Sequence, residues 1–242
     1  MDALIYTVMS GAGRALRALE VHANNIANAQ TDGFRAELES ARTRSVAGYG
    51  YDSRHLIELQ ANVLSADGGV VEETDRELDA AIQGRGYFTV QGPNGGNAYT
   101  RAGNFQVDSD GALTVNGRPV IGEGGPVVLP EFTSVRIGED GTLSITVAGD
   151  TEVQAVDRLE LVDADASELV KNEIGLLVPR NGAPLPASDD VRVLGGHLER
   201  SNVSPVDEMT STMALNRAFE VQMRLYNAAG DMADAGNRLI RG

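Results

Sequence analysis

Apolar residues recur at both ends of the chain with alternating spacings of four and three, which is typical of a helix that packs along its length against other helices. Near the start the pattern occupies Ile5, Met9, Ala12, Leu16, Leu19, Ala23 and Ile26. It predicts a helix over roughly residues 3–28, about 39 Å long at 1.5 Å per residue. Near the end the pattern occupies Leu215, Phe219, Gln222, Tyr226, Ala229, Ala233, Gly236 and Ile240, of which only Gln222 is plainly polar.

The second helix has a start signal at Ser204-Pro205-Val206-Asp207: a capping residue, a proline in the first turn and an acid. Several positions of both patterns hold small residues. Burying all seven side chains of such a pattern therefore contributes only on the order of 10 kcal/mol. Ordering a helix of this length costs at least as much backbone entropy. We therefore expect the two helices to need each other, and helices from other chains. A helical hairpin that closes an ordinary domain within one chain is the alternative, and periodicity alone leaves it open.

From about residue 75 the hydrophobic period changes to two and glycine becomes frequent, as in short strands joined by tight turns. The strand-like runs cover residues 81–82, 87–90, 98–100, 105–107, 112–115, 127–129, 135–137, 143–147, 153–156 and 159–162. Turn signals separate them, among them residues 92–96, Asp108-Ser109-Asp110-Gly111 and Asn116-Gly117. This spacing predicts an antiparallel β domain.

The predicted fold class is therefore α+β, with terminal helices paired as a coiled-coil-like domain and an antiparallel β domain between them. Residues 1–36 with 201–242 form the predicted discontinuous helical domain, and residues 76–200 form the β domain. Residues 37–75 carry several glycines and only short apolar runs, so we interpret them as an extended connector.

Three amide side chains gather where the first helix is expected to end, at Asn24, Asn25 and Asn28. Gly33 tolerates a positive φ and can turn the chain, after which Phe34 can fold back as an anchor. The amides both donate and accept hydrogen bonds, so they can tie neighbouring backbones together at a crowded junction. Solvent-facing amides near a frayed helix end are the alternative, and the pattern alone favours it.

Composition and charge exclude several classes of protein. The chain has 242 residues, is 42% hydrophobic and 23% charged, and contains no cysteine. It can therefore fold, but it cannot form disulfides or thiolate metal sites. The net charge of −15, concentrated between two nearly neutral ends, argues against binding nucleic acid or an anionic membrane. No apolar run is long enough to span a bilayer, and the first residues lack the pattern of a cleaved secretory signal.

The residues that catalysis or cofactor binding would require are missing. The three histidines, His22, His55 and His197, have no second ligand at helical spacing, so we expect no metal site. Residues 108–111 fit a β-turn better than a calcium loop. Residues 84–86 lack the helix and third glycine of a nucleotide-binding loop. We therefore expect no catalytic residue, no cofactor and no small-molecule substrate.

Three stretches converge on one resemblance. Residues 23–34, ANNIANAQTDGF, resemble the N-terminal signature of the bacterial flagellar rod and hook proteins. Its matching positions are Asn24, Asn25, Ile26, Ala27, Asn28, Thr31, Gly33 and Phe34, followed by the basic Arg35. Residues 81–122 resemble the β-domain core of that family, and residues 201–232 resemble its C-terminal helix. Within the family, the opening MDALIYTVMSGA and the chain length are most similar to the proximal rod subtype.

This resemblance implies a non-enzymatic structural subunit that polymerises through its terminal helices into the rod, the drive shaft that crosses the periplasm. Its partners would be copies of itself, other rod proteins and the flagellar type III export apparatus, with no cleaved signal peptide. The apolar seams would be the assembly interface, and the amide-rich stretch would be packed at the junction of helix and β domain. The alternatives are another axial protein, such as the distal rod or hook subunit, and an acidic secreted β-domain enzyme or binding protein.

Overall fold

The computed structural model describes residues 2–45, 55–59, 63–147, 149, 152–172 and 174–241, and it describes no side chain at residues 2–4, 41–45, 55–59, 233, 240 and 241. Contacts divide the chain into two compact units. The helical unit comprises Met1–Ala27, Glu37–Val63 and Ser204–Gly242, and the β-rich unit comprises Asn28–Ala36 and Leu64–Val203. Residues 37–63, part of the predicted connector, thus group with the terminal helices, whereas the predicted domain boundaries lie at residues 36, 75 and 200.

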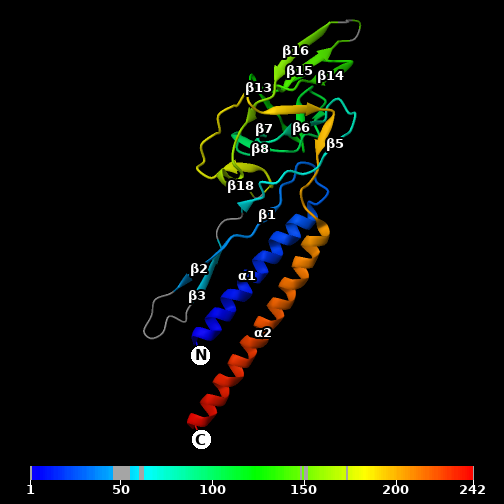
Figure 1. Cartoon of the computed structure of the whole chain (residues 1–242). Helices are drawn as coiled ribbons and strands as arrows, with labels where there is room; N and C mark the ends of the chain where they lie inside the picture. Colours follow the sequence, from blue (N-terminus) through cyan, green and yellow to red (C-terminus); the bar gives the residue numbers. More distant parts are fainter. Residues whose placement is uncertain are drawn as a thin grey trace. The chain divides into compact units, whose positions relative to one another are not determined.

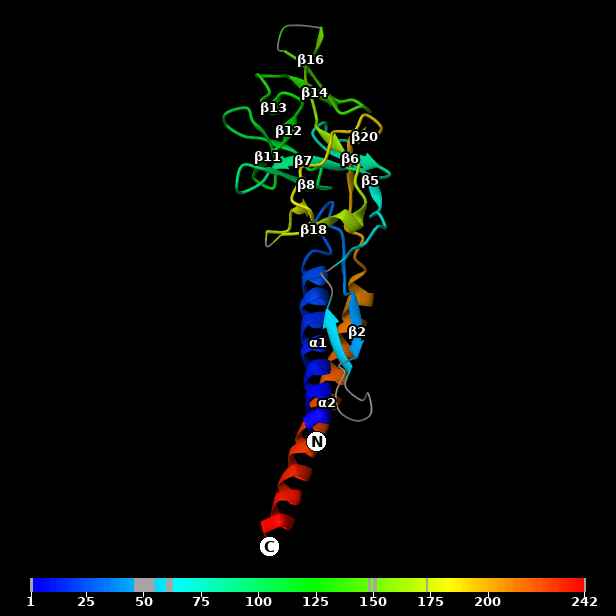
Figure 2. The same ribbon diagram turned by 90° about the vertical axis from the view of Figure 1, so that its left-hand side faces the viewer.

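The helical unit is built on α1 (Asp2–Ala27) and α2 (Pro205–Arg241), which confirms the two predicted helices (Figure 1). They run antiparallel, because Gly11 near the start of α1 lies against Gln222 whereas His22 near its end meets Glu208. The same unit contains β1 (Glu37–Leu38) and an antiparallel pair, β2 (Ala41–Ser45) and β3 (His55–Leu59), which lies along α1 (Figure 2). The predicted extended connector therefore contains paired strands.

The β-rich unit consists of short strands, and every strand pairing whose register the structure describes is antiparallel, as predicted. They are β4 (Val63–Leu64, whose first residue belongs to the helical unit), β5 (Val71–Glu73), β6 (Ala80–Gln83), β7 (Tyr87–Gln91), β8 (Asn97–Thr100), β9 (Gln106–Val107), β10 (Leu113–Val115), β11 (Arg118–Pro119), β12 (Ile121–Gly122), β13 (Gly125–Pro126), β14 (Ser134–Ile137), β15 (Thr142–Thr146), β16 (Val153–Arg158), β17 (Leu161–Val162), β18 (Leu169–Lys171), β19 (Leu177–Pro179), β20 (Arg192–Gly195) and β21 (His197–Glu199), with one 3₁₀ turn, η1 (Ala166–Glu168).

The strands form several small sheets. The largest has the order β17-β7-β8-β19-β18, and a second has the order β14-β15-β16. Further pairs join β20 to β6 and β21 to β5, so segments more than 100 residues apart in the chain are hydrogen-bonded neighbours. These two pairs hold the segment that precedes α2 against the first strands of the unit.

Most predicted strands are present, but the strand predicted at residues 127–129 is wrong. This segment makes a single bridge, between Val128 and Ala112, although Val127 and Leu129 are buried. The Asn116-Gly117 hairpin is confirmed: both residues have positive φ, 52° and 73°, and they connect Val115 to its cross-strand partner Arg118. Such a pair matches the twist of the flanking strands.

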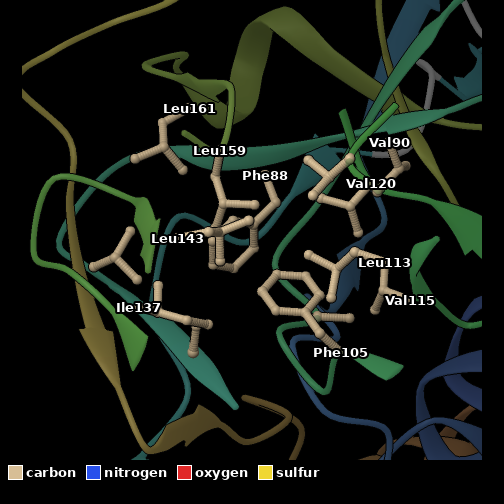
Figure 3. Close-up of a cluster of buried hydrophobic side chains, with 14 of the residues drawn as sticks. Phe88, Val90, Phe105, Leu113, Val115, Val120, Ile137, Leu143, Leu159 and Leu161 are labelled. Carbon is tan, nitrogen blue, oxygen red and sulfur yellow. The ribbon is translucent and has the colours of Figure 1, made fainter. Parts of the chain in front are cut away.

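The core of the β-rich unit is apolar and closely packed around Phe88 and Phe105, whose rings meet edge to face with centroids 5.1 Å apart (Figure 3). A smaller buried cluster surrounds Tyr99, whose hydroxyl accepts a hydrogen bond from Leu185 N at 2.8 Å. Within the described part of the chain, no helix combines the length and the hydropathy needed to cross a bilayer.

Candidate functional site

The face of α1 that packs in the helical unit is made of small residues. Val8, Gly11, Ala12, Ala15, Ala18, Val21 and Asn25 are buried at spacings of three and four. Alanine and glycine let two helix backbones approach closely, although they bury little area. The buried face of α1 therefore presents mostly short side chains, and the larger apolar side chains of α1 lie outside this face.

Those larger side chains include members of the predicted seam. Of that seam only Ala12 is buried; Ile5, Leu19 and Ile26 are half-buried, and Ala23 is exposed. Met9 and Leu16 keep 59% and 48% of their surface exposed. The predicted seam is thus offset by about one residue from the face that α1 buries within its own chain. Its role as an assembly interface stays a prediction.

The predicted seam of α2 coincides better with its least exposed face. Ala229 is fully buried, Leu215 and Phe219 are half-buried, and Tyr226 is exposed at 38%. The side chains of Ala233 and Ile240 lie outside the described ones. Gln222 is the polar member of this face: a Cβ added to Gly11 would lie 2.6 Å from its Nε2. Its buried Oε1 has no hydrogen-bond partner among the described residues.

Asn25 closes the end of α1 and shows that the packed interpretation of the amides is correct at this position. Its Nδ2 donates to Glu37 O at 3.0 Å, and Glu37 N donates to its Oδ1 at 3.0 Å. Nδ2 also donates to Glu208 Oε1 of α2 at 3.1 Å, while Glu208 Oε2 pairs with His22 Nδ1. Asn24, by contrast, is exposed.

The turn after α1 belongs to the β-rich unit and requires glycine. Thr31 N donates to Asn28 O at 3.0 Å, and Thr31 Oγ1 donates to Asn28 Oδ1 at 3.2 Å. Gly33 has φ +69°, and its N–H donates to Glu199 O at 2.7 Å. A Cβ at Gly33 would overlap the backbone of Arg101 and Ala102. Both the conformation and the space therefore exclude a side chain here.

Phe34 is half-buried rather than an anchor in the core. The Lys171 ammonium lies 3.7 Å from the centroid of its ring, close enough for a cation–π interaction. The same ammonium donates to Arg35 O at 3.1 Å. Lys171, the only lysine of the chain, thus covers Phe34 and holds the residue after it.

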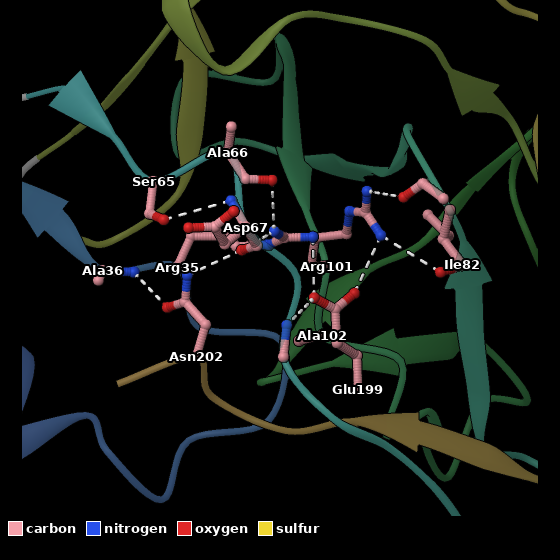
Figure 4. A network of polar contacts seen from close by, with 12 residues as sticks. Arg35, Ala36, Ser65, Ala66, Asp67, Ile82, Arg101, Ala102, Glu199 and Asn202 are labelled. Carbon is pink, nitrogen blue, oxygen red and sulfur yellow. Dashed lines mark hydrogen bonds and ion pairs between the residues drawn. The ribbon is translucent and has the colours of Figure 1, made fainter. Parts of the chain in front are cut away.

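Two arginines share one buried glutamate beside this turn (Figure 4). Arg35 Nη2 pairs with Glu199 Oε1 at 2.8 Å, and Arg101 Nη1 pairs with Glu199 Oε2 at 2.9 Å. All three side chains are buried, with at most 6% of their surface exposed. Backbone carbonyls satisfy further donors: Ala66 and Asp67 accept from Arg35, and Ile82 and Gly84 accept from Arg101.

The electrostatics of this cluster follow from its burial. Burial lowers the pKa of Arg101, Glu199 acts against this shift and Arg35 adds to it. Burial also disfavours the charged form of Tyr87 and so raises its pKa. The Arg101 Cζ lies 5.2 Å from the centroid of the Tyr87 ring.

Arg101 and Glu199 are not recognisable as a pair from the sequence, because 98 positions separate them. No local signal marks this pair either, because polar residues flank both charges: Thr100 precedes Arg101, and Arg200 follows Glu199.

Comparison with known proteins identifies three matching family models. Residues 5–35 match the "Flagella basal body rod protein" model, residues 81–145 match "Flagellar hook protein FlgE/F/G D1 domain", and residues 194–239 match "Flagellar basal body rod FlgEFG protein C-terminal". The first match contains the α1 end and its turn, and the third contains Glu199 and most of α2.

Full-length relatives agree with these matches. The chain is 39% identical over 248 aligned residues to the flagellar basal-body rod protein FlgF of Salmonella typhimurium, covering 99% of both chains. FlgF of Escherichia coli K12 is equally similar over the same coverage. The flagellar basal-body rod protein FlgG of Buchnera aphidicola subsp. Schizaphis graminum is 30% identical, over 88% of this chain and 90% of the relative.

Proposed function

Because the chain belongs to the family of flagellar basal-body rod proteins, we propose that it polymerises through the outward-facing apolar residues of its terminal helices. It is a structural subunit of the rod, and its FlgF relatives favour the proximal rod over the distal rod or hook. A structural role assigns it no enzymatic activity, no cofactor and no small-molecule substrate.

The exposed apolar stripe of α1 carries this proposal. Met9 and Leu16 lie one helical face away from the small residues that α1 buries in its own chain, and both are about half exposed. On α2, Met209, Met213, Val221 and Leu225 are exposed as well. Exposed apolar patches on a helix pair mark interaction surfaces, because water is an unfavourable environment for them. A subunit that repeats along a rod can bury this stripe against its neighbours.

We assign its partners accordingly. Copies of this chain and other rod proteins would add helices to the exposed stripe, so that α1 and α2 become members of a coiled-coil-like bundle. The flagellar type III apparatus would export the subunit to a rod that lies in the periplasm. The strongly negative net charge is consistent with protein partners and disfavours nucleic acid.

The test uses three aspartate substitutions in the full-length chain, expressed in a strain that lacks its own copy. Leu16→Asp places a charge on the exposed stripe, so the purified subunit should fold with nearly unchanged stability but should fail to enter rods. Arg17→Asp changes an adjacent exposed position that the stripe excludes, so it should assemble far better. Ala18→Asp buries a charge between the helices and should unfold the pair itself.

The measurements are thermal unfolding of each purified subunit, the amount of each variant in isolated basal bodies, and swarm diameter. Normal rod incorporation of Leu16→Asp, at the level of Arg17→Asp, would show that the stripe faces solvent in the assembly and that polymerisation uses another surface.

A further inference from the structure

The sulfur atoms of the chain are confined to its two terminal helices. The chain has six methionines and no cysteine, so methionine thioethers are its only sulfur groups. None of them lies between residues 10 and 208, and the β-rich unit therefore contains none. Five have side chains that the structure describes, and we call them the helix methionines: Met9, Met209, Met213, Met223 and Met232.

All five helix methionines are exposed on the helical unit. Between 38% and 64% of the surface of each is accessible, although methionine is among the side chains that are most often buried. Met209, Met213 and Met223 lie within an arc of about 80° on α2, at roughly 100° per residue. Met9 shares the exposed stripe of α1 with Leu16. The apolar surface that the unassembled subunit presents to water is therefore rich in thioethers.

An exposed thioether reacts with peroxides, and the chain contains neither cysteine nor tryptophan to compete for them. The sulfur lone pair attacks one peroxide oxygen, so that an S–O bond forms while the O–O bond breaks. A proton then passes from the new S–OH group to the released hydroxide, which leaves a sulfoxide and water. The sulfur is oxidised by two electrons, and the peroxide is reduced by the same two.

We propose that the helix methionines are a modification site, at which hydrogen peroxide prevents the unassembled subunit from entering the rod. The sulfoxide oxygen is a hydrogen-bond acceptor on a side chain that was apolar before. It disturbs the free subunit little, because water satisfies the oxygen at these exposed positions. It becomes unfavourable once a neighbouring helix covers it, since an acceptor buried without a donor loses its hydration. The inference rests on the polymerisation proposed above, in which neighbouring subunits cover this apolar surface.

The β-rich unit does not take part in this reaction. It contains no thioether, so a peroxide concentration that oxidises the helix methionines leaves its apolar core unchanged. The reaction therefore alters the surface that assembles without altering the fold. It is also reversible, because methionine sulfoxide reductases convert the sulfoxides back to thioethers.

Two variants separate the helix methionines from other targets of peroxide. The leucine variant keeps apolar side chains of similar volume without sulfur. It carries Met9→Leu, Met209→Leu, Met213→Leu, Met223→Leu and Met232→Leu. The relocated variant adds Val128→Met to these changes, because Val128 is an apolar residue of the β-rich unit with 55% of its surface exposed. It thus offers peroxide a thioether outside the helices.

The first measurement treats the purified full-length subunit with hydrogen peroxide and locates sulfoxides by peptide mass spectrometry. All five helix methionines should be oxidised, while thermal unfolding of the β-rich unit stays as in the untreated protein. Thioethers that stay unmodified under a treatment that fully oxidises free methionine would overturn the modification site.

The second measurement expresses the wild type together with either variant in a strain that lacks its own copy. The ratio of the two chains in isolated basal bodies is read from peptides that differ in mass. Without peroxide both chains should enter about equally. Peroxide during expression should lower the wild-type share at least about fivefold against the leucine variant, because sulfoxides buried in the rod are unpaired. The relocated variant should keep its share although Val128→Met is oxidised.

An unchanged ratio beside sulfoxides on the wild-type chain, or an equal fall of the relocated variant, would overturn this inference and leave the proposed function intact. If the leucine variant does not enter rods even without peroxide, the wild type alone decides. Its incorporation must then fall under peroxide and recover when the cells overproduce methionine sulfoxide reductases, and no fall or no recovery would overturn the inference. A wild-type chain that never enters rods would overturn the proposed function, and mass spectrometry would still decide the modification site.

Discussion

Asn25 and Glu37 exchange two hydrogen bonds, so that a side-chain amide takes the place of a neighbouring strand. Asn25 Nδ2 donates to Glu37 O and Glu37 N donates to Asn25 Oδ1, both at 3.0 Å. An amide is the only common side chain that offers this donor and acceptor in one plane. The presence of Asn25 in the family signature therefore has a geometric reason: its amide fixes the backbone of β1 to the end of α1.

Asn25→Asp tests this reason with almost no change in size. The carboxylate keeps one acceptor but loses the donor to Glu37 O, and it faces the Glu208 carboxylate at the distance where the amide donated. We expect a loss of about 2–4 kcal/mol in the free energy of unfolding, measured by urea denaturation at pH 7. Asn227→Asp, the same change at an exposed position of α2, should cost less than about 0.5 kcal/mol. Equal losses would mean that the amide pairing contributes nothing specific.

Gly33 can be compared with Gly117, because both have φ near +70°. A Cβ at Gly33 would overlap the backbone of Arg101 and Ala102, whereas a Cβ at Gly117 would meet no atom within 4 Å. Gly117→Ala should therefore cost about 1 kcal/mol, the conformational penalty alone. Gly33→Ala should cost at least about 3 kcal/mol, since the neighbouring backbone must move. Chemical denaturation of both variants gives the difference, and similar costs would contradict the close approach at residue 33.

Phe34 and Lys171 should be energetically coupled. In a double-mutant cycle, Phe34→Leu removes the ring while keeping apolar volume, and Lys171→Met removes the charge while keeping the stem. The distance of 3.7 Å between the ammonium and the ring centroid predicts a coupling free energy of about 0.5–1 kcal/mol. Because Phe34 is only half-buried, Phe34→Ala should cost about 2 kcal/mol, below the range for a ring buried in a core. A coupling near zero would show that the two side chains are merely adjacent.

The last turns of α2 should be ordered only in the assembly. Beyond Ala229 the described side chains are almost all exposed, Met232 at 54% and Leu239 at 86%, and α2 continues past the start of α1 in both views (Figures 1 and 2). An isolated helical segment of about ten residues is marginal in water. Amide exchange of the purified monomer should therefore be fast over residues 232–241 and slower over residues 206–225, and protection should appear at 232–241 in rods. Strong protection of this end in a verified monomer would contradict the prediction.

Sequence patterns predicted the elements better than the faces. The two helices, the antiparallel pairing and the Asn116-Gly117 turn all rest on local signals, and all are present. The buried face of α1 was not predicted correctly, because the bulky residues that set the periodicity, Met9 and Leu16, are exposed. Ala15 and Ala18 are buried instead. A helix with apolar residues on two adjacent faces gives a periodicity that does not say which face belongs to the chain itself.

The polar cluster could not be derived from the sequence at all. Arg35, Arg101 and Glu199 come from three distant segments, and long-range backbone hydrogen bonds bring these together: Gly33 N donates to Glu199 O, and Ala80 N donates to Gly103 O. The segment at residues 127–129 shows the opposite error, because its apolar run predicts a strand. Its burial is real, but its hydrogen bonds run to three separate residues, Gly111, Leu113 and Val120. Burial of side chains and regular pairing of strands are distinct properties, and the pattern of apolar residues indicates only the burial.

The small-residue face of α1 has a mechanical consequence. Alanine surfaces such as those of Ala15 and Ala18 interlock weakly, so they oppose sliding of one helix along the other less than bulky side chains do. Glu208 of α2 fixes the pair lengthwise instead, because it pairs with His22 and accepts a hydrogen bond from Asn25. Gln222 lies against Gly11 about 21 Å further along α2 at 1.5 Å per residue. Glu208 therefore resists shear along the helix axis, and a subunit that loses it would keep its helices but oppose sliding of one helix along the other less.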